Sequence, residues 1–148
     1  MRAFIALELP ADFADDVAAM ARRLSASLDG RFLDRSTYHL TLAFLGDIDD
    51  TEASRAMDAL DAACAGSTSV SLASDSLGKF GRPADAMLWL GVAPGPALLS
   101  LAERVREELA ARDVPFDPKP FRPHITLGRR VHIPKKPLPL LAFPLPAQ

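Results

Sequence analysis

The sequence is poor in cysteine and histidine and has no long apolar run. Its 148 residues include a single cysteine, Cys64, which excludes an internal disulfide. The apolar runs fall short of the roughly 18 residues that a membrane-spanning helix needs. The formal net charge of −2 excludes nucleic-acid binding through bulk electrostatics. These absences fit the reducing cytoplasm, and any contact with nucleic acid has to be local.

The composition is that of a globular protein with a core, because 49% of the residues are hydrophobic and 24% are charged. The length predicts one domain over residues 1–148, with similar halves at about 1–66 and 67–131 and a proline-rich segment at 132–148. Nine of the 13 prolines lie at or after Pro115. Proline removes sheet donors, so we expect the last segment to be an edge element or extended, with its apolar side chains on the body.

Hydrophobic periodicity predicts alternating strands and helices. The expected helices cover residues 10–28, 51–64 and 98–109. The expected strands cover residues 3–9, 31–36, 38–46, 69–77, 86–92 and a segment that begins near His124, with a loop at Gly78–Asp85 between the fourth and fifth.

The second predicted helix carries a start signal and an apolar stripe. Asp49 followed by Glu52 resembles a capping box. Met57, Leu60 and Cys64 lie on one face at helical spacing, so we expect that face to be buried, with Cys64 as a core thiol.

The stretch YHLTLAFLG, residues 38–46, places a histidine and a threonine two residues apart. Alternation puts His39, Thr41 and Ala43 on one face of this strand. The leucines between them and Phe44 then lie on the opposite, apolar face. Alone, such a pair is more typical of the solvent-facing side of an antiparallel sheet than of a functional site.

The stretch RPHITLGRR, residues 122–130, repeats the spacing with His124 and Thr126. Each motif strand follows a predicted helix, which indicates a duplicated α+β unit whose pseudo-twofold packing brings the motifs face to face. Displacement at phosphorus needs a base on the attacking oxygen and an acid on the leaving oxygen. Two opposed imidazoles can serve these roles at neutral pH, with threonine hydroxyls donating to the phosphate oxygens.

A metal site is the rival hypothesis for two histidines. Neither motif has a carboxylate or cysteine at ligand spacing, and His132 is the only other imidazole. We interpret His132 as a surface residue and expect neither a metal nor another cofactor.

The sequence resembles the 2H phosphoesterases, and within them the bacterial RNA 2′,3′-cyclic phosphodiesterases, also called the 2′-5′ RNA ligase family. The resemblance covers most of the chain. It rests on four stretches in the family order, which are RAFIALELP, HLTLAFLG, LGKFGRPADAMLWLGV and FRPHITLGR. Tyr38 departs from the pattern, because relatives usually have a small or amide residue before the first histidine.

The resemblance implies a two-lobed α+β fold, with antiparallel sheets lining a central cleft and helices outside. It implies metal-independent opening of RNA 2′,3′-cyclic phosphate ends to a 2′-phosphate, and in some relatives the reverse, 2′-5′ ligation. Carried over to this chain, His39 is the proton donor and His124 the proton acceptor, with Thr41 and Thr126 beside them.

The sequence identifies the residues that contact substrate less closely than it identifies the two histidines. Alternation from His124 selects Arg130 as the phosphate clamp, whereas the family spacing selects Arg129, and a bulge at Gly128 would reconcile the two. Phe80 is expected in a loop, either as a core aromatic or stacked on a base. Trp89 is expected in the core.

Two other functions remain open. The second hypothesis is a non-catalytic module that binds a nucleotide or an RNA end, with activity lost through a shortened C terminus. The third hypothesis is a structural domain whose histidines face solvent. The expected partners are RNA ends or nucleotides that carry a 2′,3′-cyclic phosphate, with neither a membrane nor an obligate protein partner.

Overall fold

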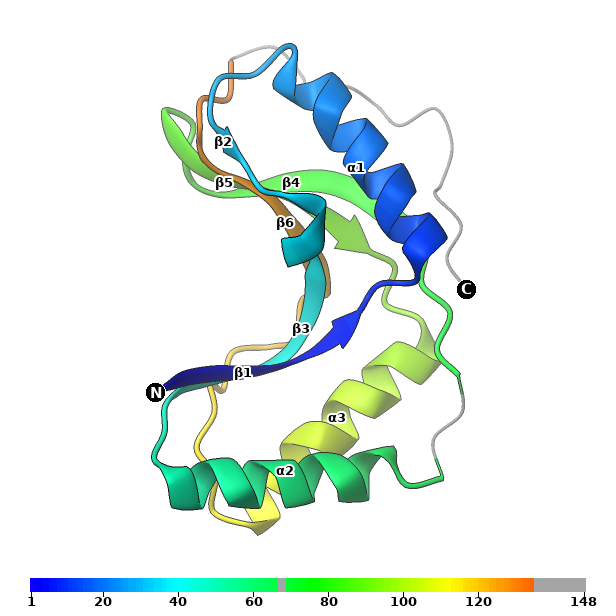
Figure 1. The fold of residues 1–148 in the computed structure, drawn as a ribbon, viewed down its shortest axis with the longest axis vertical. Coiled ribbons are helices and arrows are strands. Elements are labelled where there is room, and N and C mark those ends of the chain that lie inside the picture. The colour runs from blue at the N-terminus through cyan, green and yellow to red at the C-terminus, as the bar shows by residue number, and fades with distance from the viewer. Residues whose placement is uncertain (67–68, 135–148) are drawn as a thin grey trace. The chain divides into compact units, whose positions relative to one another are not determined.

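The fold of the chain is described by a computed structural model that covers residues 1–66 and 69–134. Helices and strands are interspersed along it (Figure 1). The elements in chain order are β1 (Arg2–Glu8), α1 (Ala11–Ser25), β2 (Arg31–Phe32), the 3₁₀ helix η1 (Arg35–Thr37), β3 (His39–Asp47), α2 (Asp50–Cys64), β4 (Ser74–Arg82), β5 (Asp85–Val92), α3 (Pro96–Ala111) and β6 (His124–Val131).

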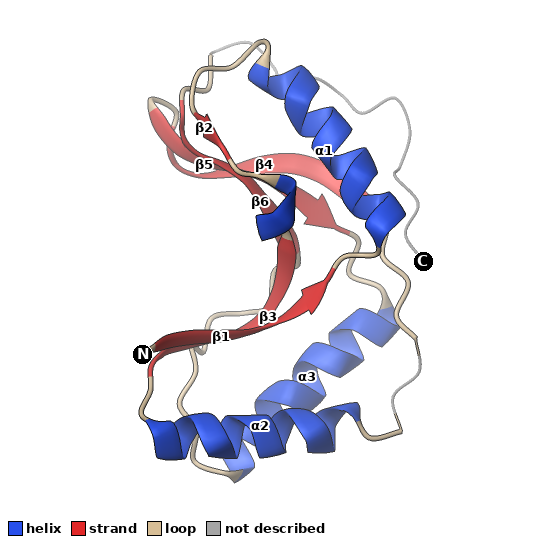
Figure 2. Ribbon diagram, in the orientation of Figure 1, coloured by secondary structure: helices blue, strands red, loops and turns tan. Residues whose placement is uncertain are grey.

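The strands form two antiparallel sheets, which confirms the α+β class (Figure 2). One sheet pairs β1 with β3, and the other has the order β2-β6-β5-β4. The two His-x-Thr motifs therefore open strands of different sheets. The expectation for the proline-rich end concerns residues that lie mostly outside the described part of the chain. Within residues 1–66 and 69–134, no helix is long and apolar enough to cross a membrane.

The chain divides into two compact units, each assembled from three segments. Of the described residues, unit 1 contains 1–7, 41–66, 69–71 and 94–122, and unit 2 contains 8–40, 72–93 and 123–134. The division does not follow the sequence halves at about 1–66 and 67–131. Each unit takes segments from both halves, and β3 passes from unit 2 into unit 1 after Leu40.

Unit 2 has a core between α1 and the four-stranded sheet, which lie beside each other in Figure 1. The buried stripe of α1 includes Phe13 and Val17, and the strands contribute side chains that are almost wholly inaccessible. These strand residues are Leu88, Leu90, Ile125 and Leu127. Burial of such side chains contributes about 1.5–3 kcal/mol each, so this face of the sheet is committed to the core.

In unit 1, α2 packs against α3, and the two helices cross at an angle in Figure 2. The capping box at the start of α2 is confirmed, because the Asp49 N–H donates to Glu52 Oε1 at 3.0 Å and the Glu52 N–H donates to Asp49 Oδ1 at 2.7 Å. Helix α3 begins at Pro96, whose missing N–H is not needed in the first turn.

The expected buried face of α2 is wrong. Met57 is 69% exposed and Cys64 is also exposed, so Cys64 is not a core thiol. The buried residues of this helix are Ala56, Ala59 and Ala63. An alanine stripe lets two helices approach closely, and the larger side chains then remain in solvent.

The expected loop at Gly78–Asp85 is also wrong. Strand β4 continues to Arg82 and β5 begins at Asp85, so only Pro83 and Ala84 lie between them. Phe80 is consequently a strand residue, paired with Met87.

Candidate active site

Strand β6 presents His124 and Thr126 on the face of the four-stranded sheet opposite the core. Their cross-strand partners on β5 are Gly91 and Trp89. The residues that alternate with them, Ile125 and Leu127, are completely buried. The alternation read from the sequence is therefore correct for this motif.

Aromatic side chains surround the His124 ring. Phe80 meets it edge to face, with ring centroids 5.4 Å apart and an interplanar angle of 88°. Trp89 lies 5.8 Å from it, and Phe80 and Trp89 are 5.3 Å apart. Such packing limits the rotation of the imidazole and fixes the direction of its nitrogen atoms.

Trp89 is not the core residue that the sequence suggested. Its place in an apolar strand was misleading, because Leu88 and Leu90 take the core face and Trp89 takes the face of His124. A Cβ on Gly78 would lie 2.3 Å from the indole, so only glycine leaves room for this ring. In the described chain, the buried indole N–H has no hydrogen-bond partner.

Thr126 and Arg129 meet at one sulfur atom. The Thr126 hydroxyl lies 3.9 Å from Met87 Sδ, and Arg129 Nη1 lies 3.3 Å from the same atom. A thioether is a weak acceptor, so both donors can turn to a stronger one at little cost. Sequence analysis did not identify Met87.

The β5–β6 register is irregular around Gly128, where Leu88 pairs with Gly128 while Trp89 pairs with Thr126. This irregularity brings Arg129 to the Met87 sulfur atom. Arg130 adopts a left-handed backbone conformation with φ of 52° and is exposed. The structure thus groups Arg129, rather than Arg130, with Thr126.

Arg31 is a further cation that sequence analysis missed. It is the cross-strand partner of Arg129, and directly opposed residues share a sheet face. In the described part of the chain, neither guanidinium forms an ion pair with a carboxylate. Two opposed like charges destabilise a sheet pair, and a bound anion would offset that repulsion.

His39 is oriented by the backbone that precedes it. Its Nδ1 lies 2.8 Å from the carbonyl oxygen of Thr37. A carbonyl oxygen can only accept, so Nδ1 carries the proton and donates this bond. The other ring nitrogen, Nε2, then accepts a proton when the ring is neutral and donates one when it is charged.

The turn before His39 is held by Asp34. Its carboxylate accepts hydrogen bonds from the hydroxyl and the backbone N–H of Ser36. These bonds hold the pKa of Asp34 below its ordinary value of 3.8, with the side-chain bond as the larger cause. Arg35 anchors the same turn to α1, because it donates to Asp15 Oδ1 at 2.6 Å and to the Ala11 carbonyl at 3.0 Å.

Thr41 lies in unit 1, where the alternation predicted for β3 does not continue. Leu42 and Ala43 are both buried, Phe44 is half exposed and Leu45 is buried again. The expected grouping of Ala43 with Thr41 and of Phe44 with the buried leucines is therefore wrong. A shift of one residue, as at a bulge, accounts for the change of phase.

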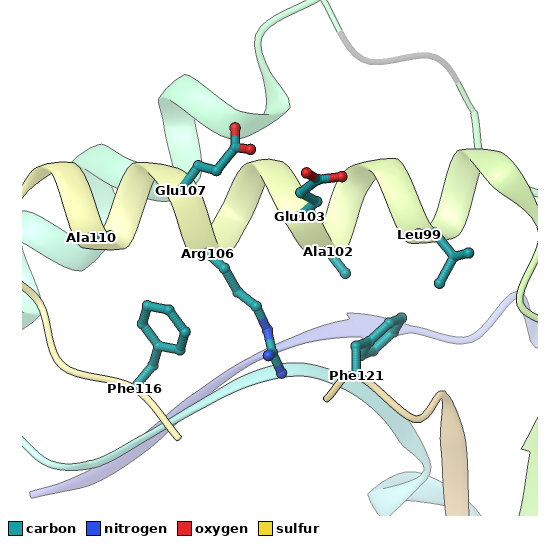
Figure 3. A pocket seen from close by; sticks show the side chains of 8 residues that line it. All are labelled: Leu99, Ala102, Glu103, Arg106, Glu107, Ala110, Phe116 and Phe121. Carbon is teal, nitrogen blue, oxygen red and sulfur yellow. The ribbon is translucent and has the colours of Figure 1, made fainter. Parts of the chain in front are cut away.

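The part of β3 that lies in unit 1 is held by α3 and by the segment that follows α3. Arg106 reaches from α3 toward the strands between Phe116 and Phe121 (Figure 3) and donates to the carbonyl groups of Leu42 and Lys119, at 3.4 and 2.8 Å. Arg106, Phe116 and Phe121 line a groove of about 510 Å³ that is mainly apolar. We assign it a structural role, because its Arg106 is engaged by carbonyl oxygens.

The structure thus gathers His124, Thr126, Phe80 and Arg129 on one sheet face and places His39 and Thr41 at the start of β3. His132 is exposed, as expected. Among residues 1–66 and 69–134, no three histidine, cysteine, aspartate or glutamate side chains are grouped as a metal site requires.

The chain is similar to a known protein family and to individual members of it. Residues 9–138 match the family described as the 2′-5′ RNA ligase superfamily. The RNA 2′,3′-cyclic phosphodiesterase of Geobacillus stearothermophilus is 36% identical over 129 residues, which are 86% of this chain and 41% of that protein. The enzyme of the same name from Thermotoga maritima is 31% identical over 138 residues, which are 92% of this chain and 73% of that protein.

Solved structures agree in fold. Apo LigT of Escherichia coli superimposes with a TM-score of 0.71 at 27% identity, and the superposition covers 99% of this chain and 82% of that one. TT0787 of Thermus thermophilus reaches 0.75 at 23% identity, covering 99% of this chain and 84% of that one. The family match spans most of the sequence and includes both His-x-Thr motifs, so the chain belongs to the 2′-5′ RNA ligase superfamily.

Proposed function

We propose that this protein opens 2′,3′-cyclic phosphates at RNA ends and leaves a 2′-phosphate, without a metal ion. The observation that carries the proposal is the repeated motif strand. β3 and β6 begin with the same sequence of partly buried and buried residues through the first five positions, from His39 and from His124. Relatives named RNA 2′,3′-cyclic phosphodiesterase support the reaction class.

His124 is the base in this reaction and His39 is the acid. The His124 imidazole takes a proton from water as the water oxygen forms a bond to phosphorus. The bond from phosphorus to the 3′ oxygen breaks, and Nε2–H of the charged His39 ring donates its proton to that oxygen. The product is a 2′-phosphate with a free 3′-hydroxyl, and the proton moves back from His124 to His39 through solvent.

The charge on the phosphate is balanced by donors that stand beside the histidines. Thr41 and Thr126 donate their hydroxyl protons to the non-bridging oxygens. The guanidinium of Arg129 releases the Met87 sulfur and binds the same oxygens, and its planar fork suits a phosphate. Arg130, in its left-handed turn, is the weaker candidate for this contact.

Phe80 is the residue that we assign to the base of the terminal nucleotide. Its ring lies on the His124 face and is already packed against Trp89, so stacking a base on it needs little ordering. Nucleotides occupy E. coli LigT in crystals that contain 3′-AMP or ATP. When a 5′-hydroxyl replaces water as the attacking group, the same chemistry joins two RNA ends through a 2′-5′ linkage.

The test is incubation of the purified protein, in chelator, with an RNA that ends in a 2′,3′-cyclic phosphate, followed by phosphorus NMR. We expect a 2′-phosphate as the only product. A 3′-phosphate, or turnover that needs added divalent cations, would contradict the proposal. Saturable binding of a 2′-phosphorylated nucleotide without turnover would favour the alternative, a non-catalytic module that binds RNA ends.

A further inference from the structure

Two large aromatic side chains of unit 1 are exposed next to each other on the two-stranded sheet. Phe4 of β1 and Phe44 of β3 are each 50% exposed, and their ring centroids are 6.4 Å apart with an interplanar angle of 51°. A single exposed phenylalanine needs no explanation, but a neighbouring pair on a sheet is typical of an interaction surface. We call Phe4 and Phe44 the aromatic pair.

The pair is held on a fixed framework. On β1, Ile5 is buried, so alternation places Phe4 on the opposite, exposed face. On β3, Ala43 and Leu45 are buried on either side of Phe44. The Phe44 carbonyl also accepts a hydrogen bond of 2.8 Å from the Asp117 N–H, which fixes the backbone at this residue.

Charge and position near the pair suit a phosphate backbone. Arg2 is exposed and shares its face of β1 with Phe4, two residues away. Phe44 is exposed although Ala43 and Leu45 are buried, so a one-residue shift after Leu42 would place it on the accessible side of β3 with Thr41. Thr41 lies three residues before Phe44, or about 10 Å along an extended strand. Aromatic rings on a sheet beside a cation are the usual elements of a surface for single-stranded RNA.

We propose that the aromatic pair stacks on nucleotides that lie on the 5′ side of the cyclic phosphate, with Arg2 contacting the backbone between them. A 2′,3′-cyclic phosphate closes the 3′ end, so the remaining RNA extends only on the 5′ side and any added contact must be made there. This inference rests on the proposed function and narrows its substrate class to single-stranded RNA several nucleotides long.

The test compares a mononucleotide with a pentanucleotide, both ending in a 2′,3′-cyclic phosphate. For the variant Phe4→Ala/Phe44→Ala, we expect KM for the pentanucleotide to rise about 5-fold to 100-fold, the range expected for loss of base stacking. The parameters for the mononucleotide should stay within about 2-fold. Equal loss on both substrates, or no loss on either, overturns the inference.

A matched control removes two other exposed apolar side chains of unit 1. The variant Met57→Ala/Leu99→Ala changes α2 and α3 only, and it should leave both substrates unaffected. If the alanine double variant does not fold, Phe4→Leu/Phe44→Leu keeps apolar volume and removes the stacking faces. We expect it to reproduce the selective loss, and normal pentanucleotide kinetics in it would count against the inference.

Binding measurements separate this inference from the proposed function. Fluorescence anisotropy of a labelled pentanucleotide with a 2′-phosphate end measures RNA binding at the aromatic pair even if the protein has no turnover. We expect weaker binding in Phe4→Ala/Phe44→Ala, and a smaller salt dependence of binding in Arg2→Gln, by about 0.7 in the slope of log affinity against log salt. Concentration-dependent dimerisation that the double alanine variant abolishes, with RNA binding unchanged, would assign the pair to a second copy and overturn the inference.

Discussion

The strands β3 and β6 carry the same motif on different supports. β6 lies between β2 and β5 in a four-stranded sheet, and His124 is held by the side chains of Phe80 and Trp89. Within residues 1–66 and 69–134, β3 pairs with β1 alone, and His39 is held by the carbonyl group of Thr37 in the preceding turn. The comparison teaches that one motif can be oriented in two ways, by packing across a sheet or by a local hydrogen bond.

Removal of either imidazole is expected to have the largest effect, and it tests whether both motifs are catalytic. We expect His39→Ala and His124→Ala each to lower kcat by about 10²-fold to 10⁴-fold, because each removes one proton-transfer group. Turnover of the RNA cyclic phosphate, measured at several pH values, checks this expectation. The wild-type pH profile should be bell-shaped, and each variant should lose one limb of it.

Circular dichroism provides the control, since both histidines are only partly buried and both variants should fold. A folded His124→Ala variant with wild-type turnover would show that the β6 motif is not catalytic. The comparison between the two strands would then be structural only.

The packing that holds His124 can be disrupted without changing either His-x-Thr motif. A Cβ at Gly78 would overlap the Trp89 indole, so Gly78→Ala has to displace that ring. We expect a loss of about 1–3 kcal/mol in the free energy of unfolding, as for other overpacked sites. Trp89 is the only tryptophan of the chain, so its fluorescence reports the displacement directly.

Gly95→Ala is the matched control, because a Cβ at Gly95 meets nothing within 4 Å. It should leave both fluorescence and turnover close to those of the wild type. Unchanged fluorescence in Gly78→Ala would mean that the glycine is not what positions Trp89.

Much of this architecture follows from the sequence. The three helices and both motif strands were predicted because their apolar periodicity is long and regular, and the Asp49–Glu52 capping box because it is local. The faces of Trp89 and Met57 were not predictable in this way. An apolar strand such as β5 has two apolar faces, and only tertiary packing decides which one carries Trp89.

The sites that sequence missed depend on pairing between distant strands. Met87 and Arg31 join the His124 face only because β5 and β2 flank β6 in a particular register. The phase shift in β3 after Leu42 likewise has no marker such as glycine at that position. A one-residue shift reverses the face of every later side chain, which is why Phe44 was placed in the core.

The support of His39 is tested by two aspartates that each cap a helix start. Asp34→Ala removes the bonds to Ser36 and loosens the turn that carries Thr37, so we expect turnover to fall by about 10-fold. Asp49→Ala removes the capping box of α2, which follows the end of β3 opposite to His39. It should lower the free energy of unfolding by about 0.5–2 kcal/mol without changing turnover.

The pH dependence adds a readout that simple destabilisation would not move. The lowered pKa of Asp34 means that its carboxylate stabilises the fold at neutral pH, and that this contribution is lost as pH falls through the folded-state pKa. Asp34→Ala should lack this step in the acid unfolding curve. Equal effects of the two variants on turnover would show that the turn does not position His39.

The smallest expected effect concerns the residue before each motif histidine, which is Tyr38 in one case and Pro123 in the other. Tyr38 is 8% exposed, and burial raises its pKa above the ordinary value of 10.0, with a smaller contribution from the charge of Asp34. It is the only tyrosine, so the ultraviolet absorbance of tyrosinate reports it alone. We expect its titration midpoint to lie above 10 in the folded protein and to return to about 10 in denaturant. Since the folded-state pKa is the higher one, stability is unaffected below pH 10 and decreases as pH rises through it, and Tyr38→Phe should remove this decrease. A folded-state midpoint at or below the denatured one would mean that Tyr38 ionises freely, and that the turn before His39 is as open to solvent as the segment before His124.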